Sequence, residues 1–171
     1  MVFQDPQSAL NPVMRIDQQL AEGMRYLLGY SKKKAREESE RLLFSVGIQE
    51  PERCLRAYPH QLSGGMRQRV LIAAALSCKP DLLICDEITS SVDSIVQSQL
   101  LTLLGEIKNQ FNTSILLITH NLRAIKRITD RIIVLLQGRV VEEGKTAEIF
   151  GRPAHAFTRS LIASLPSLKP R

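Results

Sequence analysis

The sequence predicts an α/β fold with a parallel sheet core and a largely helical segment ahead of it. Residues 82–85 and 114–119 are short and almost wholly apolar, which is typical of strands buried on both faces of a sheet. Between them, residues 95–111 carry apolar side chains at helical spacing, and a strand–helix–strand order favours parallel strands. Apolar residues also recur at helical spacing over residues 15–46, so we expect helices before the sheet.

Each further element rests on a local signal. The pattern over residues 15–46 indicates two helices with a break near Gly29, and residues 47–61, which hold two prolines, indicate a connector. A helix is expected from residue 63 to residue 78 and is ended by Pro80. The last third of the chain predicts a short helix over 122–129, a hairpin of strands 131–136 and 139–142 joined at Gln137-Gly138, and small helices over 146–150 and 155–165.

The composition indicates an ordinary globular protein, because 44% of the 171 residues are hydrophobic and 23% are charged. These values exclude a disordered or collagen-like chain. The longest apolar run, residues 70–76, is too short to cross a bilayer. Three cysteines without C-x-x-C spacing fit reduced thiols of a cytosolic protein better than a disulfide framework or a zinc site.

The net charge of +6 is compatible with nucleic acid, acidic lipid or nucleotide phosphates as partners. The densest basic stretch, residues 32–36, is followed at once by Glu37, Glu38 and Glu40, which indicates the exposed face of a helix. Aromatic residues make up 5% of the chain and include no Trp, so few side chains could stack on bases. We therefore favour a solvated face over a nucleic-acid patch.

Ser63-Gly64-Gly65 opens the helix expected from residue 63. Glycines in a first turn leave unpaired backbone N–H groups accessible, so an anionic phosphate could approach closely, and Ser63 adds a hydroxyl donor. The alternative is that Ser63 is a simple helix cap. These three residues by themselves leave both interpretations open.

Acidic and imidazole side chains follow the two expected strands. Asp86 is placed to hold Mg²⁺, and Glu87 to orient and deprotonate a water that attacks a γ-phosphate. His120 follows the second strand, where it could donate to a phosphate oxygen. Open α/β sheets bind ligands at the carboxyl ends of their strands, so all three would face one edge. The alternatives are two surface carboxylates and a structural histidine.

Five segments, in this order and spacing, resemble the nucleotide-binding subunit of an ABC transporter over essentially the whole chain. They match the glutamine loop at Gln4, the signature at residues 62–66, the Walker B strand at residues 82–87, the D-loop at residues 90–93 and the switch-histidine loop at residues 119–121. Residues 58–61 and 155–161 resemble the dipeptide, oligopeptide and nickel importer branch, in which other subunits select the cargo.

The resemblance implies a partial P-loop NTPase fold of the ABC ATPase type. It would comprise an inserted α-helical subdomain at residues 12–78, an α/β core at residues 79–145 and a helical tail at residues 146–171. The implied cofactors are ATP and Mg²⁺, with Asp86 and Gln4 at the metal and Glu87 and His120 as catalytic residues. The implied nucleotide contacts are Gln4, Ser63, Gly64, Gly65, Met66 and Asp93.

The resemblance also implies partners and a location. It implies a transport-coupled ATP hydrolase at the cytoplasmic face of the cell membrane, bound to permease subunits and not inserted in the bilayer. The signature residues and Asp93 would face a second ABC ATPase subunit, and no nucleic acid is expected as a partner. The cargo stays open between peptides and nickel.

Three substitutions depart from the family pattern. Met66 replaces the usual signature glutamine, and Asn121 replaces the aspartate after the switch histidine. Ile88 stands where proline normally follows the glutamate. Proline would fix φ at that position, so we expect the loop carrying Glu87 to be less constrained with isoleucine.

A fourth departure concerns the phosphate-binding loop. The 171 residues contain no G-x-x-x-x-G-K-[ST], and Gly144-Lys145-Thr146 lacks the first glycine of that motif. We therefore expect a nucleotide-binding domain that lacks its Walker A segment, with negligible ATP affinity and turnover by itself. Two alternatives remain: a non-catalytic partner that donates its signature to an intact ATPase subunit, and a soluble ABC-type ATPase that acts on nucleic acid.

Overall fold

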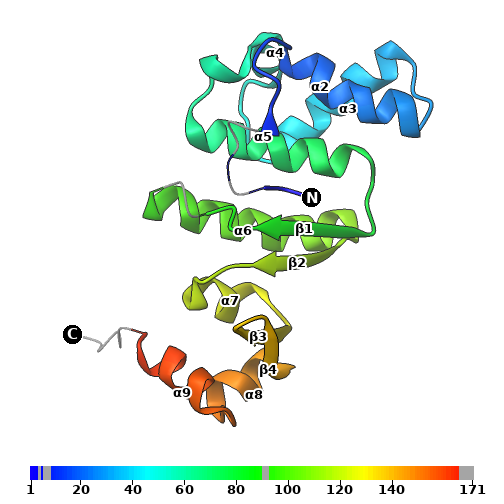
Figure 1. Ribbon diagram of the computed structural model, residues 1–171. Coiled ribbons are helices and arrows are strands. Elements are labelled where there is room, and N and C mark those ends of the chain that lie inside the picture. Colours follow the sequence, from blue (N-terminus) through cyan, green and yellow to red (C-terminus); the bar gives the residue numbers. More distant parts are fainter. Residues whose placement is uncertain (4, 6–8, 90–92, 166–171) are drawn as a thin grey trace. The chain divides into compact units, whose positions relative to one another are not determined.

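The computed structural model describes residues 1–3, 5, 9–89 and 93–165 (Figure 1). These fall into two compact units, Met1–Ile118 and Thr119–Arg171, and each is described by itself. The first contains α2 (Ile16–Leu27), α3 (Lys32–Ser45), α4 (Pro51–Arg56), the 3₁₀ helix η1 (Pro59–Gln61), α5 (Gly64–Ser77), β1 (Leu82–Asp86), α6 (Ser94–Phe111) and β2 (Ser114–Ile118). The second contains α7 (Leu122–Ile128), β3 (Arg131–Leu136), β4 (Arg139–Lys145), α8 (Thr146–Gly151) and α9 (Ala156–Ala163).

Helices α2 to α5 pack against one another in the first unit (Figure 1). On α2, the residues one turn apart, Ile16, Leu20 and Met24, are fully buried. Gly29 follows this helix with φ +64, a left-handed conformation that commonly ends helices. The predicted break near Gly29 is therefore confirmed.

The expected connector over residues 47–61 is itself partly helical, which corrects the sequence analysis. Pro51 begins α4 and Pro59 begins η1. Proline is favourable at the first position of a helix, because an N–H group there would have no carbonyl acceptor within the helix. Cys54 and Leu55 of α4 are buried against the neighbouring helices. Two prolines that suggested irregular structure instead start helices.

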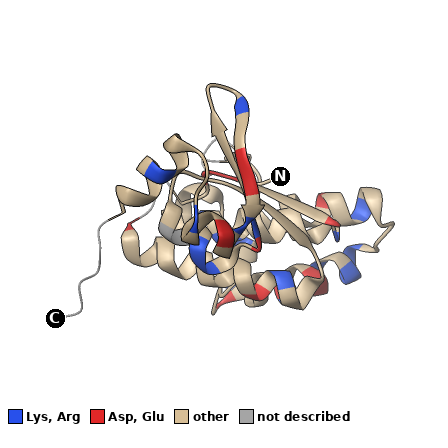
Figure 2. Ribbon diagram, turned by 90° about the horizontal axis from the view of Figure 1, so that it is seen from below, with Lys and Arg blue, Asp and Glu red and all other residues tan. Residues whose placement is uncertain are grey.

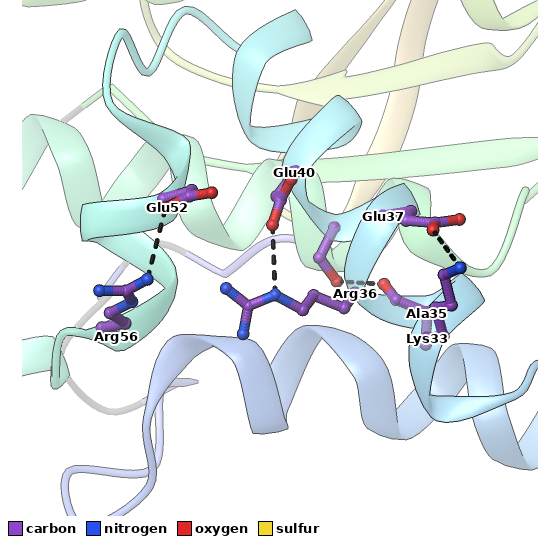
Figure 3. Close-up of polar contacts among 8 residues, drawn as sticks. Lys33, Ala35, Arg36, Glu37, Glu40, Glu52 and Arg56 are labelled. Carbon is purple, nitrogen blue, oxygen red and sulfur yellow. Dashed lines mark hydrogen bonds and ion pairs between the residues drawn. The ribbon is translucent and has the colours of Figure 1, made fainter.

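The basic stretch at residues 32–36 lies on α3, which also carries Glu37, Glu38 and Glu40. Figure 2 shows how Lys and Arg alternate with Asp and Glu along the ribbon. Figure 3 shows Lys33 beside Glu37, with Nζ 4.0 Å from Oε1, and the Arg36 guanidinium 3.3 Å from the Glu40 carboxylate. The inner face buries apolar residues, and there the Ser39 hydroxyl donates to the backbone carbonyl of Ala35. The prediction that this stretch lies on the exposed face of a helix is confirmed, whereas the preference against a nucleic-acid patch stays a prediction.

Strands β1 and β2 form a parallel pair, with Leu82 opposite Ser114 and Asp86 opposite Ile118. Val2 joins the other edge of β1: its N–H donates to Ile84, and its carbonyl accepts from Asp86. Burial of Cys85 raises the pKa of its thiol to about 12. The parallel sheet that the sequence predicts is therefore present.

The expectation of two strands buried on both faces is wrong: β1 buries only one face, with Leu82 on the other face 50% exposed, and β2 is more exposed still. Leu116 and Ile118 each keep 44% of their surface exposed, whereas Leu83 and Cys85 of β1 are fully buried. An apolar run shows that a strand can be buried, but not whether another part of the chain covers it.

In the second unit, β3 and β4 form the predicted antiparallel hairpin. Gln137 and Gly138 at its tip have φ +49 and +76, the two positive values of a tight hairpin turn. Strand β4 continues to Lys145, beyond its expected end, and α8 begins at the next residue, Thr146. Gly144-Lys145-Thr146 is thus a strand-to-helix junction, with the Thr146 hydroxyl donating to the Thr129 carbonyl at 2.8 Å.

Charge divides unevenly between the two units. Residues 1–118 contain thirteen Lys and Arg and thirteen Asp and Glu, whereas residues 119–171 contain ten and four. The whole net charge of +6 therefore belongs to the second unit. Among the helices that the structure describes, none is long and apolar enough to cross a membrane.

Candidate functional site

The start of α5 carries the Ser63-Gly64-Gly65 motif. Ser63 has extended backbone, and its hydroxyl accepts from the N–H of Met66 at 3.3 Å. The cap interpretation is therefore confirmed. This bond uses the N–H group of Met66. The N–H groups of Gly64 and Gly65 lie in the first turn of the helix, where no carbonyl acceptor is available within the helix. A Cβ added to Gly64 would meet no atom within 4 Å, so the turn is open to an incoming group. Ser63 can therefore cap α5 while the N–H groups of Gly64 and Gly65 remain available to a phosphate.

The start of α6 lies directly beside the start of α5. A Cβ added to Gly65 would lie 3.2 Å from Cγ1 of Val96, so glycine allows this close approach. Asp93 caps α6, since its Oδ1 accepts from the N–H groups of Ile95 and Val96 at 3.0 Å each. The family resemblance implies a subunit contact for Asp93 but not this cap, although aspartate directly before a helical pattern is the usual signal of one.

Asp86 and Glu87 end β1 and begin the loop that follows. The N–H of Asp86 donates to Val2, and that of Glu87 donates to the carbonyl of Ile118 at 2.9 Å. Both residues therefore lie at the carboxyl edge of the sheet, as predicted from the strand pattern. Glu87 has φ +48, a left-handed conformation that is uncommon for residues other than glycine.

Ile88 bears on the conformation of that loop. Proline at position 88 would drive the residue before it toward extended backbone, so isoleucine permits the left-handed Glu87. The Ile88 side chain is only 1% exposed, and Thr89 beside it is buried and accepts from Nε2 of Gln97 at 3.2 Å. Burial and this hydrogen bond hold residues 88 and 89, and the lesser constraint relative to proline stays a prediction.

His120 is exposed and lies two residues beyond β2, within the second unit. Thr119 accepts from the N–H of Asn121 at 3.1 Å, and α7 begins at the next residue. The arrangement of His120 toward Glu87 remains a prediction from the sequence. Gln4 and residues 90–92, the expected glutamine loop and most of the D-loop, lie outside the described residues.

The tail motif at residues 155–161 is built around Glu142 of β4. Its carboxylate accepts from the N–H groups of Ala154 and His155 at 2.7 and 3.0 Å. The Thr158 hydroxyl beside it and these two N–H groups hold the pKa of Glu142 below its usual range. Nδ1 of His155 caps α9 by accepting from Phe157 at 3.2 Å. These motif residues thus have structural roles that sequence spacing did not reveal.

The acidic residues at the sheet edge suit a metal ion whose other ligands come from a nucleotide and from water. Among the described residues, no group of three or more His, Cys, Asp or Glu side chains forms a stand-alone metal site. Mg²⁺ is commonly held by one or two carboxylates together with nucleotide phosphates and water. Asp86 at the end of β1 fits that arrangement, because it supplies one such carboxylate.

Known proteins resemble this chain in sequence. The profile of a family described as "ABC transporter" matches residues 1–90. The oligopeptide transport ATP-binding protein OppD of Salmonella typhimurium is 46% identical over 168 residues, which cover 98% of this chain and 50% of OppD. AppD of Bacillus subtilis, with the same description, is 46% identical over 97% of this chain and 51% of its own length.

The glutathione import ATP-binding protein GsiA of Escherichia coli is 44% identical over 98% of this chain and 27% of its own length. The chain therefore spans about half the length of the oligopeptide transport relatives that it matches, and less of GsiA.

Proposed function

This chain belongs to the ABC transporter family, which has a P-loop NTPase fold, and from that premise we propose that it acts as an ATP-binding subunit of a peptide importer. The observation that carries the proposal is identity of about 45% along nearly the whole chain to the ATP-binding proteins of oligopeptide and glutathione import. Those relatives favour peptides over nickel as the cargo. ATP hydrolysis would be coupled to transport.

The proposed chemistry divides among few residues. Bound Mg²⁺ would neutralise phosphate charge, and Asp86 with Gln4 would hold it on the nucleotide. Glu87 would orient the attacking water and accept its proton, and His120 would donate to the γ-phosphate. Glu87 suits this role because it lies directly beyond β1, in a loop whose next side chain is buried.

The proposed partners are a second ABC ATPase subunit and membrane permease subunits, at the cytoplasmic face of the membrane. Ser63, Gly64, Gly65 and Met66 would contact a nucleotide held by the second subunit, and Asp93 would lie near the same contact. The open first turn of α5 supports this role, because Gly64 and Ser63 are exposed and no side chain among the described residues covers Gly64. We assign the inserted helical subdomain to residues 12–78.

A second candidate is a non-catalytic subunit that donates its signature. It is favoured by one contrast: the first turn of α5 is fully formed, whereas these 171 residues contain no G-x-x-x-x-G-K-[ST]. Such a chain would complete the site of an intact partner without hydrolysing ATP itself.

Mixing the chain with an intact oligopeptide transport ATP-binding subunit tests both candidates. We expect the chain to raise the partner's ATPase rate and Ser63→Arg to abolish the increase. Ser31→Arg is the matched control, since Ser31 caps α3 in the same way, accepting from Lys34 at 3.2 Å. No effect of the wild-type chain, or equal effects of the two variants, would contradict the proposal.

A further inference from the structure

Arg69 connects three segments of the first unit. It lies on α5, one helical turn beyond Gly65, and is half-buried. Its Nη1 donates to the backbone carbonyl of Val46, directly after α3. Its Nη2 donates to Oε1 of Gln99 on α6 at 3.4 Å. One guanidinium thus bonds to the turn after α3 and to α6 at the same time.

The turn after α3 is shaped to receive this guanidinium. Gly47 has φ +80, which residues with a side chain rarely adopt. A Cβ added at Gly47 would also lie 2.5 Å from Nη1 of Arg69. Glycine is therefore required here for two separate reasons, backbone conformation and space for Arg69.

Arg69 continues the contact at the starts of α5 and α6. Gly65 meets Val96, and one turn further along each helix Arg69 meets Gln99. The two contacts advance in the same direction along both helices, starting from their capped ends at Ser63 and Asp93.

Beside Arg69 lies an open groove, lined mainly by the end of α3, the turn after it and α6. It has a volume of about 420 Å³ and includes Phe44, Ser98, Thr102 and Glu106 in its lining, together with Arg69 itself. At this groove the guanidinium bridges the turn after α3 and α6 by hydrogen bonds. Lysine could not replace it, because a single ammonium lacks the planar fork that reaches both acceptors.

We propose that Arg69 is a positioning residue for nucleotide contact: with Gly47 it keeps the first turn of α5 in register with the start of α6. This inference rests on the proposed function, in which Ser63, Gly64 and Gly65 contact the nucleotide. A shift of about 1 Å in such groups is enough to weaken their contacts severely.

The test compares Arg69→Met and Gly47→Ala with a matched control, Gly29→Ala. Gly29 has φ +64, but a Cβ there would meet no atom within 4 Å. All three proteins are mixed with the intact subunit, and the KM for ATP and kcat of the stimulated activity are measured. Amide hydrogen exchange at Met66, Ile95 and Val96, whose N–H groups are hydrogen-bonded to the two caps, is followed in the chain alone.

We expect Arg69→Met and Gly47→Ala each to raise the KM for ATP about tenfold and to speed exchange at both helix starts. The double variant should raise the KM no further, because the methyl group that Gly47→Ala introduces acts by displacing Arg69. Gly29→Ala should leave the KM unchanged, since strain alone lowers only the folded fraction and hence the apparent kcat.

The inference is overturned if Arg69→Met and Gly47→Ala match Gly29→Ala in KM and exchange while Ser63→Arg still abolishes stimulation. If the wild-type chain gives no stimulation at all, the proposed function fails. Amide exchange then decides the register of α5 and α6 by itself, and unchanged exchange at both helix starts overturns the inference.

Discussion

Replacing Asp93 by alanine tests the cap that holds the start of α6. Its Oδ1 accepts from two backbone N–H groups, those of Ile95 and Val96, at 3.0 Å each. Because Asp93 is exposed, water would take over both donors, and the expected loss is that of an ordinary cap, about 1 kcal/mol. For a chain of this size, that loss lowers the melting temperature by about 2–4 °C.

The assay is urea unfolding followed by far-ultraviolet circular dichroism. Asp93→Asn is the matched control, because its amide oxygen caps a helix as well as a carboxylate does. It should lose only the favourable interaction of a negative charge with the helix N-terminus, about 0.3–1 kcal/mol, and should lose less of that in high salt. If Asp93→Ala costs nothing, or if alanine and asparagine cost the same at high salt, the cap does not stabilise α6 and the reasoning is refuted.

Three further predictions follow from burial, charge and sequence. Leu43→Ala removes a fully buried side chain and should lower the free energy of unfolding in urea by about 2–5 kcal/mol. Leu27→Ala, at a site that is 72% exposed, should change it by under about 0.5 kcal/mol. Similar losses for the two variants would contradict the assignment of Leu43 to the core. The pKa of Glu142 is lowered from its usual 4.5, so its contribution to stability is complete above that pH and is lost as pH falls through the lower folded-state pKa. The protection factor of the Ala154 amide, its exchange rate relative to an unstructured amide at the same pH, should therefore fall in acid. Glu142→Gln should remove this pH dependence of the protection factor; an unchanged dependence would exclude this role. The purified chain should not hydrolyse ATP, and hydrolysis that Glu87→Gln abolishes would disprove this prediction.

Local sequence was sufficient for most of the elements. The apolar run before Asp86 forms β1, and its parallel partner β2 follows α6 as the strand–helix–strand order predicts. Gln137-Gly138 forms the hairpin turn because few residue pairs tolerate two positive φ values. Ser63 caps α5 because a hydroxyl before a helix pairs with the free N–H groups of the first turn.

The candidate site was predicted in part. Asp86 and Glu87 lie at the sheet edge that the strand pattern indicates, and Ser63 to Gly65 form an open helix start. The left-handed conformation of Glu87 was not predictable, because no glycine marks it. The burial of Ile88 was not predictable either, because it depends on residues that pack over it from elsewhere.

The sequence by itself determined the order of the elements, the strand ends that carry carboxylates, and the ABC transporter resemblance. Only the tertiary structure decided that Arg69 bonds to both Val46 and Gln99, that Glu142 accepts from Ala154, and that one side of β2 stays exposed. The physical reason is range. Helix periodicity, caps and turns depend on residues within a few positions of each other, whereas burial and long side-chain hydrogen bonds depend on partners 12 to 30 residues away.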